Sequence, residues 1–185
     1  MPPAHAFAAA AATWQNFYIL VGTAAATLIG LMFVAVTFGA SLMTPQSTPT
    51  ARAFIDPPFA HFVTVLLSAC LLLIPTMRPH VLGGALLAMT LLRAAALVNV
   101  QRRLREAHQK FGDLDLSDWL MGVILPAASY LGLVATACGF FADLPIAFEA
   151  LAVIVILILL LGVFGAWELM IWLALTRLRA KNAAE

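Results

Sequence analysis

The chain has 185 residues, of which 63% are hydrophobic and 10% are charged, whereas soluble domains carry roughly 25% charged residues. This composition excludes an ordinary soluble domain and predicts an integral membrane protein. The formal net charge of +1 leaves no excess of either sign that would attract nucleic acid. We therefore expect the lipid bilayer, and no nucleic acid, among the partners of the chain.

Five apolar segments are long enough to span a membrane, because a helix needs about 20 mostly apolar residues to cross the hydrocarbon core. They predict an all-α bundle of five transmembrane helices that forms a single transmembrane domain over residues 1–185. The first sixteen residues contain no Lys or Arg, and we expect them to be a short retained tail rather than a secretory signal. The predicted spans are 17–43, 59–77, 80–100, 119–142 and 146–176.

The positions of Lys and Arg predict the orientation, because positive residues near span ends are retained in the cytoplasm. With the N-terminus outside and the C-terminus inside, eight of these residues lie on the inner side and only Arg78 lies on the outer side. Trp14, Phe17 and Tyr18 are then expected in an outer aromatic belt.

The first connection contains Arg52 and Asp56 at i,i+4 spacing, which favours a short interfacial turn of helix. Pro57 and Pro58 follow and are expected to stop that turn, because proline lacks the backbone N–H and clashes with the preceding turn. The fourth connection is marked by Asp143 and Pro145.

Small and hydroxylated residues recur on one side of three predicted helices. At 100° per residue, they form narrow stripes on the first, second and fourth spans. Such stripes are typical of close helix contacts, and they also suit a hydroxyl-lined aqueous passage. The candidate path-lining residues are Thr23, Thr27, Thr37, Ser41, Thr64, Ser68, Ser129 and Thr136. Gly22, Ala26 and Gly30 add a small-xxx-small ladder to the first span, which indicates a helix contact.

Arg93 and Glu168 are charges within predicted spans. Each lies nine residues before a basic residue at its span end, Arg102 and Arg177, and hence about 13 Å from the inner boundary. Because the two depths match, we hypothesise an ion pair within one subunit or between two subunits. The pair would hold two helices together or, in the functional alternative, line a water-filled path or bind an ion.

His61 follows Asp56 at the predicted cytoplasmic start of the second span. Hydrogen bonding at the interface is one interpretation, and a pH-sensitive interface formed by His61 and Asp56 is the other.

No motif indicates an enzyme. The sequence contains no GxSxG, Walker, GxGxxG or HExxH pattern, so we expect no catalytic residues and no cofactor. Its four histidines share no ligand spacing, and Cys70 and Cys138 are expected to be small buried apolar residues, so we also expect no metal site.

Two classes of function remain. The first is an oligomeric channel or small-solute permeation protein, in which several copies build the path because five helices are too few for a two-repeat transporter. The second is a non-catalytic accessory or assembly subunit of a larger membrane complex. The alanine content and the preference for Arg over Lys suit a bacterial cytoplasmic (inner) membrane.

Double-mutant cycles test the hypothesised ion pair. Arg93→Ala and Glu168→Ala should each lower the free energy of unfolding by about 3–5 kcal/mol, because each leaves a buried charge without its partner. The double variant should lose less than the sum of the two, measured as unfolding in detergent. Strictly additive losses would show that the two charges do not meet.

Overall fold

The structure is a computed structural model that describes residues 3–39, 48–75, 77–108 and 124–182. Within these ranges the chain is all-α. The described helices are α1 (Pro3–Gly39), α2 (Thr48–Leu72), α3 (Pro79–His108), α5 (Leu125–Phe141) and α6 (Ala147–Asn182).

Three helices contain stretches that are long and apolar enough to cross a membrane, namely Phe7–Gly39, Ile55–Leu72 and Ala147–Leu178. Apolar stretches of α3 and α5, Pro79–Ala94 and Leu125–Phe141, are shorter than a full span. The protein is therefore a helical integral membrane protein, as the composition predicts, and the five-span arrangement remains a prediction.

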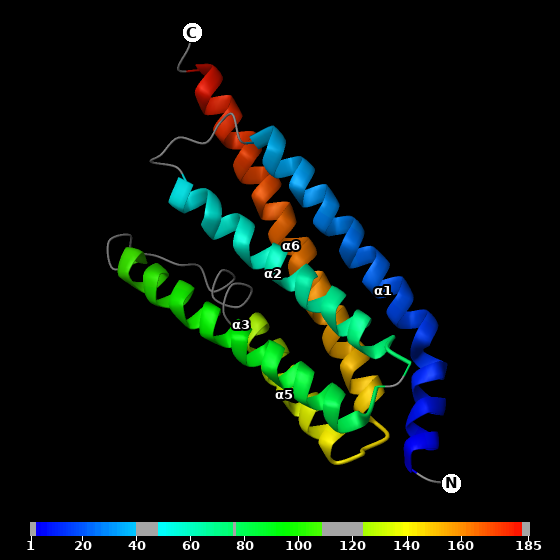
Figure 1. Cartoon of the computed structure of the whole chain (residues 1–185). Helices are drawn as coiled ribbons and strands as arrows, with labels where there is room; N and C mark the ends of the chain where they lie inside the picture. Colours follow the sequence, from blue (N-terminus) through cyan, green and yellow to red (C-terminus); the bar gives the residue numbers. More distant parts are fainter. Residues whose placement is uncertain (1–2, 40–47, 76, 109–123, 183–185) are drawn as a thin grey trace.

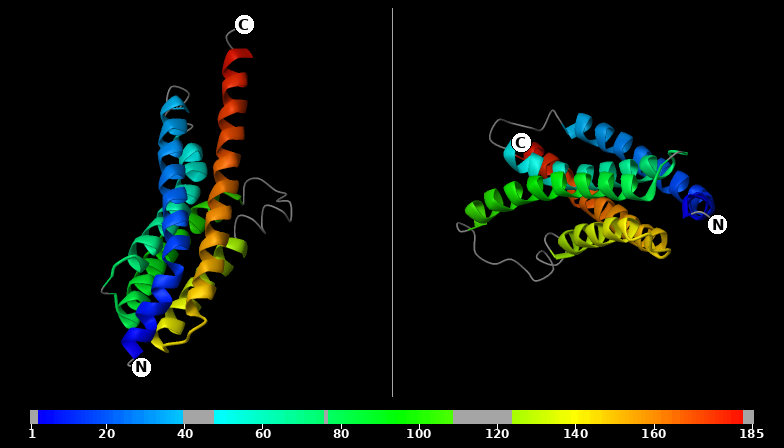
Figure 2. Two further views of the ribbon diagram at one scale, coloured as in Figure 1. Left: turned by 90° about the vertical axis from the view of Figure 1, so that its right-hand side faces the viewer. Right: turned by 60° about the horizontal axis from the view of Figure 1, so that its bottom comes forward.

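Successive helices run in alternating directions, so the two ends of the described chain lie at opposite ends of the bundle (Figures 1 and 2). Helix α2 packs mainly against α1 and α6, whereas α3 packs mainly against α5. Helix α5 also contacts α6 and so links the two groups.

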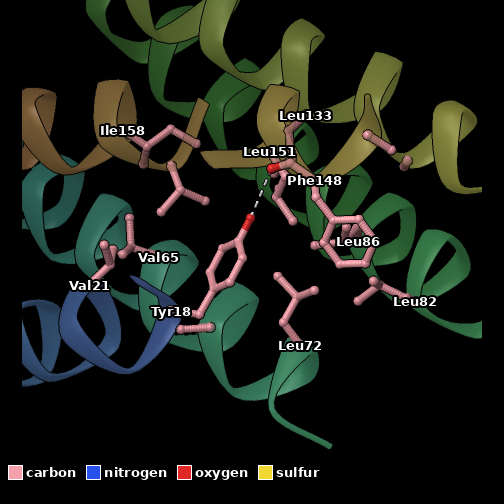
Figure 3. Close-up of a cluster of buried hydrophobic side chains, with 14 of the residues drawn as sticks. Tyr18, Val21, Val65, Leu72, Leu82, Leu86, Leu133, Phe148, Leu151 and Ile158 are labelled. Atoms are coloured by element: carbon pink, nitrogen blue, oxygen red, sulfur yellow. Dashed lines mark hydrogen bonds between the residues drawn. The ribbon is translucent and has the colours of Figure 1, made fainter. Parts of the chain in front are cut away.

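The main core lies where α1, α2, α3, α5 and α6 meet, and its side chains are almost all aliphatic or aromatic (Figure 3). Tyr18 is 1% exposed within it and donates a hydrogen bond to the carbonyl oxygen of Phe148 at 3.2 Å. Its side chain therefore faces the interior of the bundle rather than lipid, and the outer aromatic belt stays a prediction. Trp14 and Phe17 are half-buried beside it.

Helix α1 begins at Pro3, so most of the expected N-terminal tail is helical. Phe7 explains this extension, because its ring lies 5.3 Å from that of Phe148 and 6.3 Å from that of Phe140, measured between centroids. These contacts attach the first turns of α1 to the α5–α6 end of the bundle.

Helix α2 continues through Pro57 and Pro58, so the predicted stop is wrong. Proline within a helix is tolerated in membrane proteins where neighbouring helices compensate. Pro58 is buried, and a Cβ atom added to Gly165 of α6 would lie 3.3 Å from it. The glycine thus lets α6 approach the proline ring closely.

The connection between α5 and α6 has a Schellman motif at the end of α5. Leu144 N–H donates to the Gly139 carbonyl at 3.0 Å, and Asp143 N–H donates to the Phe140 carbonyl at 3.4 Å. Asp143 has φ 51°, a conformation that Asp adopts more readily than most residues. This geometry confirms the turn that Asp143 and Pro145 predict.

Cys70 and Cys138 are free and exposed on the described chain, so the expectation of burial is wrong. Burial preferences measured in soluble proteins do not transfer to a membrane chain, because lipid stabilises an outward-facing apolar side chain as well as a core does.

The contact between α2 and α6 depends on a second glycine, Gly162. A Cβ atom at this position would lie 2.5 Å from the ring of Phe62, which is itself fully buried. Gly162→Ala should therefore lower the free energy of unfolding by about 1–3 kcal/mol through overpacking. Denaturation in mixed detergent micelles measures the change.

Gly30→Ala is the matched control, because a Cβ atom at Gly30 would meet nothing within 4 Å. Its effect should stay within about 0.5 kcal/mol of zero. Equal losses for the two alanine variants would mean that close approach at Gly162 is not what joins α2 to α6.

Candidate functional site between α2, α3 and α5

A pair of polar rings, His61 on α2 and Tyr130 on α5, lies inside the bundle. His61 is 5% exposed and Tyr130 is 5% exposed, and His61 Nδ1 lies 3.1 Å from the Tyr130 hydroxyl. The rings are stacked, with centroids 5.8 Å apart and planes inclined by 30°. When the proton of the neutral imidazole is on Nε2, the tyrosine hydroxyl donates to Nδ1.

The helical repeat places His61 in this position. On α2, His61, Thr64, Val65 and Ser68 follow one another at intervals of three or four residues, and all are buried. A histidine on this face points toward α5 and α3 rather than toward lipid. It needs a hydrogen-bond partner there, because an unsatisfied polar group in an apolar interior is costly.

Thr64 extends the polar pair along α2. Its hydroxyl donates to the Ala60 carbonyl at 2.8 Å, and the side chain lies beside Tyr130. Ser68 continues the ladder by donating to the Thr64 carbonyl at 2.8 Å. His61, Thr64 and Tyr130 thus form a connected cluster, which we call the polar cluster.

Arg93 brings a positive charge to the polar cluster. The guanidinium is half-buried and interacts electrostatically with both His61 and Tyr130. It lies on the face of α3 that also bears Leu86 and Thr90, since these residues are seven and three positions before it. The charge therefore faces inward toward α2 and α5.

The cluster combines a hydrogen-bonded imidazole, a phenol and a permanent cation in an apolar surrounding. Ionisable groups in such places serve ion or proton pathways, or specify how helices pack. Because arginine does not release its proton, His61 and Tyr130 are the members that can exchange one.

The pairing of His61 with Asp56 stays a prediction. The hydrogen bond that the structure shows for His61 goes to Tyr130, and Asp56 is exposed. The sequence interpretation missed Tyr130, although the helical repeat places it on the same stripe of α5 as Pro126 and Ser129.

The hydroxyl stripes of the helices face different surroundings. On α2 and α5, the four candidate lining residues Thr64, Ser68, Ser129 and Thr136 are buried. On α1, the residues Thr23, Thr27 and Thr37 are exposed, and Ser41 lies outside the described residues.

Most of these hydroxyls donate a hydrogen bond to a backbone carbonyl of their own helix. Ser129 and Thr136 donate to the carbonyls of Leu125 and Gly132, and Thr27 and Thr37 donate to those of Thr23 and Phe33, at 2.8–2.9 Å. The buried stripes of α2 and α5 therefore lie inside the bundle, with their hydroxyls hydrogen-bonded to their own helices.

Arg93 and Glu168 lie on helices with different main neighbours. Helix α3 packs against α5 and α2, whereas α6 packs against α2, α5 and α1. Glu168 is exposed on the surface of the chain. Their pairing stays a prediction, including the arrangement between two subunits.

Among the described residues, no group of three His, Cys, Asp or Glu side chains is arranged to hold a metal ion. Glu149 is exposed in the first turn of α6, where the helix dipole favours a carboxylate. No protein-family model, curated protein or solved structure matches the chain.

The hydrogen bond between His61 and Tyr130 should stabilise the fold. Tyr130→Phe leaves the His61 ring without this partner, so His61→Phe and Tyr130→Phe should be coupled by about 0.6–1.7 kcal/mol, the range for hydrogen bonds between membrane helices. A double-mutant cycle on unfolding in detergent measures the coupling.

Thr136→Val provides the control for this cycle. Thr136 lies on the same helix as Tyr130, about 9 Å further along, and its hydroxyl is closed onto Gly132. The changes that Thr136→Val and His61→Phe cause in the free energy of unfolding should therefore add. Coupling of the same size in both cycles would contradict a specific bond between His61 and Tyr130.

Proposed function

We propose that the protein is a non-enzymatic membrane subunit that works as a homo-oligomer and lets a small solute or ion permeate between its copies. The path would be lined by the exposed stripe of α1, with Thr23, Thr27 and Thr37 toward the oligomer axis. In this proposal the chain crosses a bacterial cytoplasmic membrane five times, with its N-terminus outside and its C-terminus inside.

One observation supports this proposal above the others, namely the outward direction of the α1 stripe. The stripes of α2 and α5 are buried within the chain, whereas the three threonines of α1 lie on one exposed face. A path that several copies build together requires its polar residues on the outside of each copy.

The chemistry of these threonines suits a lining role. A hydroxyl that donates its proton to a backbone carbonyl, as Thr27 and Thr37 do, keeps its lone pairs for water or a cation. Helix α1 carries no Asp, Glu, Lys or Arg, so the path would be polar but not strongly charged.

The alternative is an accessory or assembly subunit that docks on a different membrane protein. It is favoured by Ala26 and Gly30, which are exposed on the same side of α1. Since a Cβ atom at Gly30 would meet nothing within 4 Å, a helix of a partner could approach the α1 backbone closely there.

Thiol accessibility tests the proposed path. In a background where Cys70 and Cys138, both exposed, are replaced by alanine, we would introduce Thr23→Cys, Thr27→Cys and Thr37→Cys separately. A charged methanethiosulfonate reagent should modify these cysteines in liposomes, and modification should reduce solute flux, because the positions line water.

Two positions provide controls. Leu92 is 75% exposed on α3, and Leu92→Cys should react slowly because this position faces lipid. Ser68 is fully buried, so Ser68→Cys should also be protected. The proposal would be contradicted if the α1 cysteines reacted no faster than Leu92→Cys. A purified monomer that binds a different membrane complex through α1 would instead support the accessory role.

A further inference from the structure

An apolar groove of about 460 Å³ lies between the C-terminal half of α1 and the corresponding part of α6. Its floor includes the buried side chains of Met32 and Phe62. The helices α1 and α6 that form its sides are seen in Figure 1. Among the described residues that line it, Arg177 is the one that is charged, and every other is apolar.

The groove has the length of one membrane leaflet. Its lining runs from Leu28 to Phe38 on α1, which is about 15 Å at 1.5 Å per residue. On α6 it runs from Ala166 to Arg177, a similar distance. Since the hydrocarbon core is about 30 Å thick, half of it is about 15 Å, the depth that one acyl chain occupies.

Arg177 marks the end of the groove where a headgroup would lie. One of its terminal nitrogens donates to the carbonyl of Phe38 at 2.9 Å, in the last turn of α1, which fixes the guanidinium beside the groove. A guanidinium has five N–H donors in a planar arrangement that suits phosphate. The bond to Phe38 therefore leaves donors for an anionic ligand on the exposed side of Arg177.

We infer that the groove between α1 and α6 is a binding site for an anionic phospholipid. The acyl chain lies along Leu31, Val34 and Met170, and Arg177 binds the phosphate. This inference does not depend on whether the protein forms a path, because the site lies within one copy of the chain.

Lipid retention tests the inference. The full chain is reconstituted in nanodiscs with equal amounts of phosphatidylglycerol and phosphatidylcholine of the same acyl chains, extracted into detergent, and its bound lipids are measured by native mass spectrometry. The unmodified protein should retain phosphatidylglycerol preferentially. Arg177→Gln should reduce this preference about fivefold, the effect expected for one basic residue at an anionic membrane surface.

Three further variants separate charge from shape. Arg177→Lys should keep the preference, because it keeps the positive charge. Ala174→Phe fills the groove from an exposed position and should reduce retention of both lipids. Ala135→Phe, at an exposed position of α5 outside the groove, should leave retention unchanged.

Equal retention of the two lipids by the unmodified protein would overturn the inference. So would a preference that survives Arg177→Gln, or retention that Ala174→Phe and Ala135→Phe leave equally unchanged. If Ala174→Phe changed the oligomeric state without loss of lipid, the occupant would be a second copy of the chain, which also contradicts the inference.

Discussion

The structure depends on one constraint: a polar group in an apolar surrounding must find its hydrogen-bond partner inside the protein. Serine and threonine meet this constraint locally, since Thr64, Ser68, Thr90, Ser129 and Thr136 each donate to the carbonyl four residues before. Larger polar side chains cannot do so and must reach another helix.

Two tyrosines show how this second requirement joins the helices. Tyr18 reaches from α1 to the Phe148 carbonyl on α6, and Tyr130 reaches from α5 to His61 on α2. Each bond is surrounded by aliphatic side chains, such as Val65 and Leu151 around Tyr18 (Figure 3). The rest of the contact between helices is steric, and glycines at Gly162 and Gly165 admit Phe62 and Pro58. Polar pairs thus link α1 to α6 and α5 to α2, whereas close packing supplies the larger contacts of α2 with α1 and α6 and of α3 with α5.

Sequence reasoning predicted the membrane class and the helical character well, because both follow from composition and from long apolar runs. It predicted the turn at Asp143 because turn residues act locally. It failed at Pro57 and Pro58, since the compensating contact with Gly165 comes from a helix more than 100 residues away. In a membrane chain, contacts with a neighbouring helix decide whether a proline ends its own helix. The local sequence pattern does not contain those contacts.

The candidate site was predictable only in part. His61 and Arg93 stood out as ionisable residues in apolar segments, but their common neighbour Tyr130 did not, because a tyrosine in a span resembles an ordinary core aromatic. The stripes on α1, α2 and α5 look alike in sequence, and only the packing of the helices distinguishes the buried ones from the exposed one. Periodicity identifies the face of a helix but not what covers that face.

The interior between α2, α3 and α5 is central to this fold, and we expect it to be dry, with its polar groups satisfied by hydrogen bonds within the protein. Water-edited solid-state NMR of the protein in lipid bilayers tests it most directly, by following the transfer of water proton polarisation to individual side chains. The account predicts that His61, Ser68 and Ser129 receive polarisation as slowly as the buried Leu86. Transfer to these residues as fast as to the exposed Glu149 would contradict a dry interior, because water would then reach the polar groups between α2, α3 and α5.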